Sequence, residues 1–214
     1  YNVWNGWFWA FVSPQNAFDV PGDIINHLTM ASKPGSDEIL IGVLTNLDEI
    51  YVVQWNGTAF NNLGIIESTA SVNNTPLVEV IYESQSGDGM VIWAKRSTSS
   101  LKYRIWNGAT LGPEASLPDF GSGTMYVVRA ASDPTSDHII VASIDNFGDI
   151  HVVVWDGNAW IDWREVETGA SSNIRQAVDV AWESSGDEAF VAWMASLVNN
   201  VRALTWRKGT TLAS

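Results

Sequence analysis

The sequence contains no cysteine and is poor in basic residues. Without cysteine the chain has no disulfide bridge, thiolate zinc site or cysteine nucleophile. Only 11 lysines and arginines stand against 24 acidic residues, which gives a formal net charge of −13. A protein that binds nucleic acid needs a basic surface, so we expect neither nucleic acid nor an anionic membrane as a partner.

Long hydrophobic runs and helical periodicity are absent as well. The longest apolar runs, such as residues 7–12 and 189–195, are far too short to span a bilayer, so no membrane insertion is expected. Hydrophobic residues nevertheless make up 46% of the 214 residues, enough for a sizeable core. Because the sequence begins with Tyr1, we expect a processed chain whose signal peptide has been removed.

Tryptophan is abundant, with 12 copies, and most of it is periodic. A Trp-Asn/Asp-Gly tripeptide begins at Trp4, Trp55, Trp106 and Trp155, and a degenerate copy begins at Trp206. These tryptophans are 51, 51, 49 and 51 residues apart. An aspartate that precedes an apolar run keeps nearly the same period, at Asp37, Asp88, Asp137 and Asp187. Two marks in constant phase indicate an internal repeat of about 50 residues.

Each repeat is predicted to form four short strands. The first strands are 25–31, 77–82, 125–131 and 176–182, and the near-continuously apolar second strands are 39–44, 90–94, 139–144 and 189–194. The third strands, 50–55, 101–106, 150–155 and 201–206, lead into the Asn-Gly or Asp-Gly steps that favour tight hairpins. The fourth strands, such as 58–66 and 158–166, are more polar.

Four antiparallel strands per repeat of this length are typical of a β-propeller blade. We therefore predict an all-β, single-domain propeller over residues 1–214, with repeats at about 22–68, 74–118, 122–168 and 174–206 and an extra segment at 7–18. That segment is expected to supply the outer strand of the last repeat and so to close a four-bladed ring. The alternative is a composite ring or a head-to-tail assembly of several chains.

The periodic residues are predicted to be structural. The five recurring tryptophans are expected to fill the space between blades, because residues that follow the period serve the repeat. The recurring aspartates are expected to bind backbone N–H groups of their own turns.

The stretch from His138 to Trp160 resembles the propeller repeats of fungal and bacterial fucose-binding lectins, and also those of secreted tandem-repeat proteins. The resemblance implies a propeller fold and a secreted setting. In those lectins an arginine on the second strand and a glutamate on the third hold the sugar beside a stacking aromatic. Here Ile140 and Val152 stand at those positions, and Ile41, Val91 and Val191 are equally apolar. The missing pair argues against fucose as the ligand.

Catalytic signatures are weak. The three histidines, His27, His138 and His151, lie on separate strands and predict no metal centre, and no cofactor is expected. A glycosidase needs two carboxylates at a fixed separation, and Glu79 and Asp179 are the best candidates because both lie on first strands that line the axis. The alternative is that they are solvated channel acids flanking Arg129.

The less regular aromatic residues suggest a ligand surface. Tyr82 and Trp182 are aligned with Ala31 and Ala131, and Trp93 with glycine or alanine in the other repeats, while Trp193 is displaced by one residue. Such positions either pack a tapering interior or form an aromatic floor for a sugar. The predicted ligand-binding set is Tyr82, Trp182, Trp93, Trp193, Glu79 and Asp179.

A second group of tryptophans lies on the predicted fourth strands, at the outer edge of the ring. Its members are Trp7, Trp9, Trp160 and Trp163. Clustered exposed aromatics mark protein–protein surfaces, so these residues are the predicted partner contacts, with burial under the terminal segment as the alternative.

Together these features predict a non-enzymatic, lectin-like binding or adhesion module at the cell surface or outside the cell. Its partner is expected to be a glycan or a protein, and it is a candidate homo-oligomer. The alternatives are a structural subunit of a filament or surface assembly, and a carboxylate-dependent glycosidase.

Overall fold

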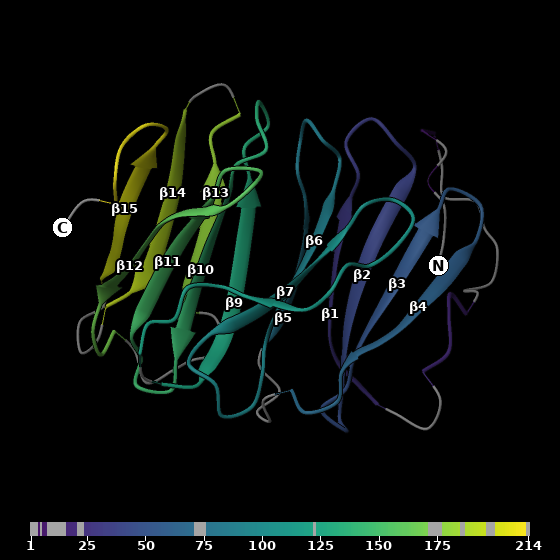
Figure 1. Ribbon diagram of the computed structural model, residues 1–214, viewed down its shortest axis with the longest axis horizontal. Coiled ribbons are helices and arrows are strands. Elements are labelled where there is room, and N and C mark those ends of the chain that lie inside the picture. The colour runs from purple at the N-terminus through teal and green to yellow at the C-terminus, as the bar shows by residue number, and fades with distance from the viewer. Residues whose placement is uncertain are drawn as a thin grey trace.

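A computed structural model describes residues 4, 6–7, 16–20, 24–70, 76–121, 123–170, 177–184, 187–195 and 200–212. These residues form strands and turns that assemble into four antiparallel sheets (Figure 1). Within these ranges no helix is long and apolar enough to cross a membrane.

Every sheet follows the chain order, with each strand hydrogen-bonded to the next. The first sheet contains β1 (Ile25–Ser32), β2 (Glu38–Thr45), β3 (Ile50–Asn56) and β4 (Phe60–Glu67). The second contains β5 (Val78–Tyr82), β6 (Gly89–Ala94), β7 (Leu101–Trp106) and β8 (Ala115–Ser116). The third contains β9 (Met125–Ser132), β10 (Ile139–Asp145), β11 (Ile150–Trp155) and β12 (Trp160–Glu167). The fourth contains β13 (Val178–Trp182), β14 (Glu188–Met194) and β15 (Val201–Arg207).

The observed strands match the predicted ones to within a few residues, because the turn residues between them are strong signals. The exceptions are outer strands. β8 has only two residues in a segment that contains Pro113 and Pro118, and proline cannot donate a ladder hydrogen bond. In the described part of the chain the fourth sheet has three strands.

The sheets fan out around their first strands, as in a β-propeller. β1 contacts β5, β5 contacts β9, and β9 contacts β13, so the first strands form the inner edge of the arrangement. The first and fourth sheets lie at opposite ends of this fan (Figure 1). In the described part of the chain the four sheets therefore form an open arc, and the predicted closure of a ring within one chain is not confirmed.

The described residues that precede β1 lie against the first sheet. Phe18 and Val20 pack on the outward face of the first sheet, where Phe18 lies 6.2 Å from the ring of Phe60. Only a short segment joins these residues to β1, which keeps them beside the first sheet and away from the fourth. Most of the predicted closing strand 7–18 lies outside the described residues.

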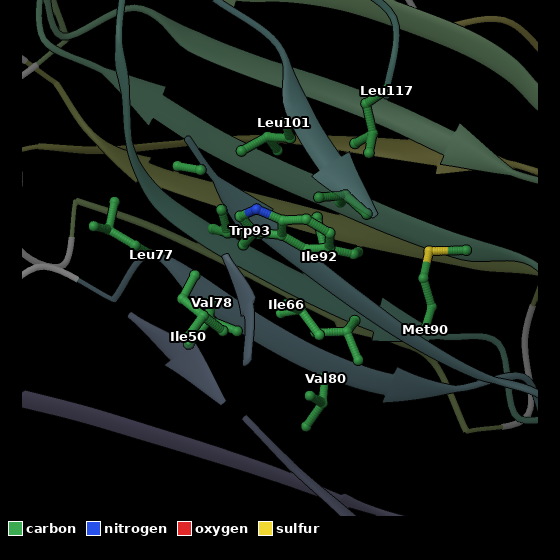
Figure 2. Packing of buried hydrophobic residues seen from close by; sticks show 14 of the residues in the cluster. Ile50, Ile66, Leu77, Val78, Val80, Met90, Ile92, Trp93, Leu101 and Leu117 are labelled. Atoms are coloured by element: carbon green, nitrogen blue, oxygen red, sulfur yellow. The ribbon is translucent and has the colours of Figure 1, made fainter. Parts of the chain in front are cut away.

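The core lies between neighbouring sheets. Trp93 on β6 is completely buried and is surrounded by apolar side chains that include Ile50, Ile66 and Leu77 (Figure 2). The sheets are closely apposed at the inner edge, because a Cβ atom added at Gly42 of β2 would lie 3.0 Å from Val78 of β5.

Three of the recurring tryptophans link one sheet to the preceding one through their indole N–H groups. Trp106 donates to Glu38 at 3.0 Å, Trp155 to Glu83 at 2.6 Å, and Trp206 to Asp162 at 3.2 Å. These three rings are buried, which confirms the predicted packing role for them. Trp4, in contrast, is half exposed, and Trp55 is half-buried.

Asp137, one of the recurring aspartates, also forms hydrogen bonds between sheets. Asp137 accepts hydrogen bonds from the backbone N–H groups of Gln85 at 2.6 Å and Ser86 at 2.9 Å, which belong to the β5–β6 turn of the second sheet. The prediction that it binds its own turn is therefore wrong for Asp137, whose hydrogen bonds reach the turn of the preceding sheet.

A buried ion pair joins the third sheet to the fourth. Asp133, in the β9–β10 turn, is fully buried and pairs with Lys208, which follows β15. It also accepts hydrogen bonds from Ser136 at 2.6 Å and from the backbone of Thr135 at 2.7 Å. Burial alone would raise the pKa of Asp133, but these donors outweigh it and lower the pKa to about 2.

Replacing Lys208 by methionine should therefore destabilise the protein at neutral pH, by about 1–3 kcal/mol for a buried carboxylate that loses a charged donor. The pKa of Asp133 in the folded state is lower than that of an aspartate in the unfolded chain, which is about 3.9. Its ionised form therefore stabilises the folded state above about pH 3.9, and this contribution disappears as the pH falls towards 2. The difference between wild type and K208M should shrink over the same interval. Urea unfolding at several pH values measures it.

The control for this experiment is R207M, because Arg207 forms an exposed ion pair with Glu188 and exposed pairs contribute little. A destabilisation by K208M that is equal at pH 7 and pH 2 would contradict the role assigned to Asp133.

Candidate functional site: a groove between the second and third sheets

The strand registers correct the sequence alignment of the predicted ligand residues. Tyr82 pairs with Gly89 and Trp182 with Ala189, in the way that Ser32 and Ser132 pair with Ile39 and Ile139. The small counterparts of Tyr82 and Trp182 are therefore serines, and the alignment with Ala31 and Ala131 was wrong by one residue.

Tyr82 is buried between the first and second sheets. Its hydroxyl donates to Glu38 at 2.9 Å, and burial together with that carboxylate raises the pKa of Tyr82. Burial works against ionisation of Glu38, but hydrogen bonds from Tyr82, Gln54 and Trp106 outweigh it and lower the pKa of Glu38. The ring thus holds two sheets together and offers no face to a ligand.

Trp182 has the corresponding place between the third and fourth sheets and is half-buried. Its ring lies 5.9 Å from that of Trp206, edge to face, and 6.4 Å from that of His138. Its buried indole nitrogen has no hydrogen-bond partner among the described residues.

Trp93 and Trp193 are true equivalents, since they pair with Val78 and Val178 at the same register position. The predicted one-residue displacement of Trp193 is therefore wrong. Trp93 donates to Glu67 of the first sheet and Trp193 to Glu167 of the third, both at 3.3 Å. Both side chains are buried and belong to the inter-sheet core.

The two predicted carboxylates lie on the innermost strands, β5 and β13, in a polar row that also contains Thr29 of β1 and Arg129 of β9. Thr29 donates to Glu79 at 2.6 Å, and Arg129 lies 3.6 Å from the other oxygen of Glu79. Burial raises the pKa of Glu79, against the effect of these partners. Asp179 is exposed and accepts a hydrogen bond from the backbone of Val180 at 2.9 Å. Glu79 thus connects three inner strands.

The four tryptophans predicted to contact a partner do not lie together in one place. Trp7 is 87% exposed, and Trp9 lies outside the described residues. Trp160 and Trp163 lie on β12 of the third sheet, where both line a groove that faces the second sheet.

This groove has a volume of about 580 Å³ and is open to solvent. The second sheet and the loop after β8 contribute Tyr103, Ser116, Leu117, Pro118 and Asp119. The third sheet contributes Trp155, Asn158, Ala159, Trp160 and Trp163. Its walls are therefore rich in aromatic rings and carry polar groups at the rim.

Three of the aromatic rings form a fixed cluster. Tyr103 lies 5.9 Å from Trp155 and 5.5 Å from Trp160, and the Tyr103 and Trp160 planes are almost perpendicular. Trp155 and Trp160 are 5.1 Å apart across the β11–β12 hairpin. Trp155 is held in place by its hydrogen bond to Glu83, so the cluster is anchored to both sheets. Trp163 lies beside it with half of its surface exposed.

One residue of the groove carries an unused hydrogen-bond donor. The indole nitrogen of Trp160 is buried and has no hydrogen-bond partner in the described part of the chain, a condition that costs free energy until a partner arrives. On the opposite wall, Asp119 accepts hydrogen bonds from the backbone of Gly121 at 2.9 Å and from Ser99 at 2.7 Å. These two donors lower the pKa of Asp119, which therefore stays ionised.

Such a groove is suited to a ligand with both apolar faces and hydroxyl groups. Flat aromatic rings bury apolar faces with little loss of side-chain freedom. The carboxylate of Asp119 accepts hydrogen bonds, and the N–H of Trp160 donates one. A sugar ring has this combination of surfaces.

Tyr103, Ser116 and Asp119 were not predicted from the sequence. A signal for Tyr103 was present, because the corresponding third-strand residues are Val52, Val152 and Ala203. Ser116 and Asp119 follow no repeat pattern, and only the packing of two sheets brings them to the groove.

No family model and no curated protein sequence matches this chain. Solved structures of fucose-binding lectins resemble it in fold. The BP39L lectin from Burkholderia pseudomallei has a TM-score of 0.67 at 12% identity, and it is matched over 87% of this chain and 54% of its own. The six-bladed β-propeller lectin from Aleuria aurantia has a TM-score of 0.55 at 13% identity, over 84% and 57%.

SapL1 lectin, solved with α-methyl fucoside, has a TM-score of 0.58 at 14% identity and is matched over 90% of this chain and 63% of its own. The chain thus spans little more than half of the length of these lectins. The likeness establishes a β-propeller-like fold. Ile140 and Val152, the positions that the resemblance gives for the sugar-binding arginine and glutamate, are completely buried.

In the described part of the chain no group of three or more histidine, aspartate and glutamate side chains is placed to hold a metal ion.

Proposed function

We propose that this chain is a lectin-like carbohydrate-binding module and that the groove between the second and third sheets holds the saccharide. The observation that carries the proposal is a groove lined by four aromatic rings, one of which, that of Trp160, carries a buried and unpaired N–H. Small-molecule sites commonly combine apolar walls with a few convergent polar groups in this way. The fold of the known lectins supports the same class of function.

The proposed recognition differs from that of an arginine–glutamate pair. A sugar would stack on Trp163 and contact Trp160, while its hydroxyl groups meet the Trp160 N–H and the Asp119 carboxylate. A module of this type acts by binding, without catalysis, and outside the cell or at its surface. The interactions of Glu79 with Thr29 and Arg129 support a structural role for that residue over a glycosidase role.

The W163A variant should lose most of the saccharide affinity. An exposed indole that stacks on a sugar contributes about 0.5–1.5 kcal/mol beyond the area that it buries, so we expect roughly a tenfold weaker Kd. A glycan array identifies a bound glycan, and titration calorimetry with that glycan measures the change in Kd.

The matched control is F147A, because Phe147 is an exposed aromatic in the β10–β11 turn that does not line the groove. F147A should bind as the wild type does. Equal loss in both variants, or no loss in W163A, would contradict the placement of the site.

A further inference from the structure

The four sheets alternate between two types with a period of 100 residues. The first and third sheets carry Ser32 and Ser132 where the second and fourth carry Tyr82 and Trp182. Asn46 in the first sheet accepts a hydrogen bond from the backbone of Ile24 at 2.8 Å, and Asn146 in the third does the same with Thr124 at 2.6 Å. The fourth sheet thus resembles the second, and the first resembles the third. The interface between the second and third sheets therefore shows how a fourth sheet would pack against a first sheet.

That interface is apolar and completely closed. The second sheet contributes Met90, Ala94 and Leu101, and the third contributes Met125 and Val128. Each of these side chains is at most 2% exposed.

The equivalent residues at the two ends of the arc are exposed. In the fourth sheet, Phe190 is 48% exposed, Met194 47% and Val201 74%. These residues stand 100 positions after Met90, Ala94 and Leu101.

On the first sheet, Ile25 is 48% exposed and Leu28 41%, although the equivalent residues Met125 and Val128 are completely buried. Met30, the next residue on this face of β1, is 58% exposed. The two halves of one apolar interface thus lie uncovered at opposite ends of the same arc.

We propose that the chain associates head to tail with a second copy, the β1 face of one copy (Ile25, Leu28 and Met30) docking on the outward face of the fourth sheet of the other (Phe190, Met194 and Val201). The two faces are different surfaces of the chain, so the contact is heterologous, and each copy retains one free face for further association.

Side-chain sizes at the two faces are complementary. In the internal interface, β6 contributes Ile92 and β9 contributes the smaller Val128 and Ala130 to the same apolar cluster. In the fourth sheet the residue equivalent to Ile92 is Ala192, and the β1 face offers the larger Leu28 and Met30. The internal interface thus combines a large residue of the second sheet with small residues of β9. The proposed contact combines the small Ala192 with large residues of β1, which keeps the packed volume similar.

The outer parts of the two faces are complementary as well. Among the described residues the fourth sheet ends at β15 and has no fourth strand. Phe18 and Val20 cover the outer part of the first sheet, and they stand 100 residues before Pro118 and Phe120 of the segment after β8. A docked copy would bring these residues to the open outer edge beside β15.

The test measures the mass of the full chain by sedimentation and light scattering over a wide range of concentration. The wild type should pass from the 23.4 kDa monomer to dimers and longer species. M30D and F190D should each weaken the association at least tenfold, because either charge would be buried in the contact. L47D is the control, since Leu47 is 58% exposed in the β2–β3 turn outside both faces.

Mixing the two variants shows the polarity of the contact. F190D retains its β1 face and M30D retains its fourth-sheet face, so an equimolar mixture should form a one-to-one dimer that does not grow. A wild type that stays monomeric at every concentration would overturn the proposal. So would association that M30D leaves unchanged, or a mixture that remains monomeric under conditions in which the wild type associates.

Discussion

Replacing Trp93 by alanine should destabilise the protein by about 3–5 kcal/mol, the usual cost of removing a large buried aromatic side chain. Trp93 is completely buried between the first and second sheets, where Ile50, Ile66 and Leu77 belong to the same cluster. The cavity would be the main cost, because Glu67, which accepts the indole N–H, keeps Lys95 at 3.2 Å as a partner. Urea unfolding followed by far-UV circular dichroism measures the effect.

W163A is the matched control for W93A, because it removes the same side chain from a half-exposed position. It should change the unfolding free energy by less than about 1 kcal/mol. If W93A were as stable as the wild type and lost saccharide binding, Trp93 would be a ligand residue after all, and the assignment of this ring to the core would be wrong.

Replacing Gly123 by alanine should also be strongly destabilising. Gly123 has a φ of +89° and lies just before β9, and an added Cβ would lie 1.9 Å from an oxygen of Asp145. Asp145 cannot easily move, because it is buried and accepts hydrogen bonds from the backbone of Phe147 at 2.8 Å and of Asp149 at 2.9 Å. We expect a loss of about 2–4 kcal/mol, composed of strain at positive φ and the disruption of this turn.

Gly121 separates these two contributions. Its φ of +90° is almost the same, but an added Cβ would meet nothing within 4 Å. G121A should therefore cost only the strain, about 1 kcal/mol. Thermal unfolding of both variants gives the difference, and equal destabilisation would show that the contact with Asp145 is unimportant.

The strands were predictable because local signals mark both of their ends. Turn residues such as Lys33-Pro34-Gly35 and the Asn-Gly steps separate apolar runs of regular length, and the first, second and third strands of the sheets follow them closely. The register was harder to predict. Asp88 stands one residue later along its repeat than Asp37 and Asp137, so an alignment on the aspartates shifts the second repeat by one. A shift of one residue moves a side chain to the other face of a sheet.

The groove and the open arc depend on long-range geometry. Trp160 and Trp163 were singled out as outer tryptophans, but nothing local shows that Tyr103 and Asp119 of another repeat lie opposite them. The prediction of a closed ring depended on whether residues 7–18 would pack on the fourth sheet or on the first. A repeat pattern does not decide between these two, because the sheets are equivalent in sequence. The apolar outward face of the first sheet takes Phe18 and Val20.

The indole N–H resonances of the tryptophans test the proposed site most directly. A ¹H–¹⁵N spectrum of the wild type, titrated with a glycan identified on the array, should show a saturable shift of the Trp160 signal, assigned with W160F. The signals of Trp106 and Trp206 should stay in place, because both groups already donate to carboxylates away from the groove. Saturable glycan binding that leaves the Trp160 signal unchanged would contradict the assignment of the groove as the saccharide site.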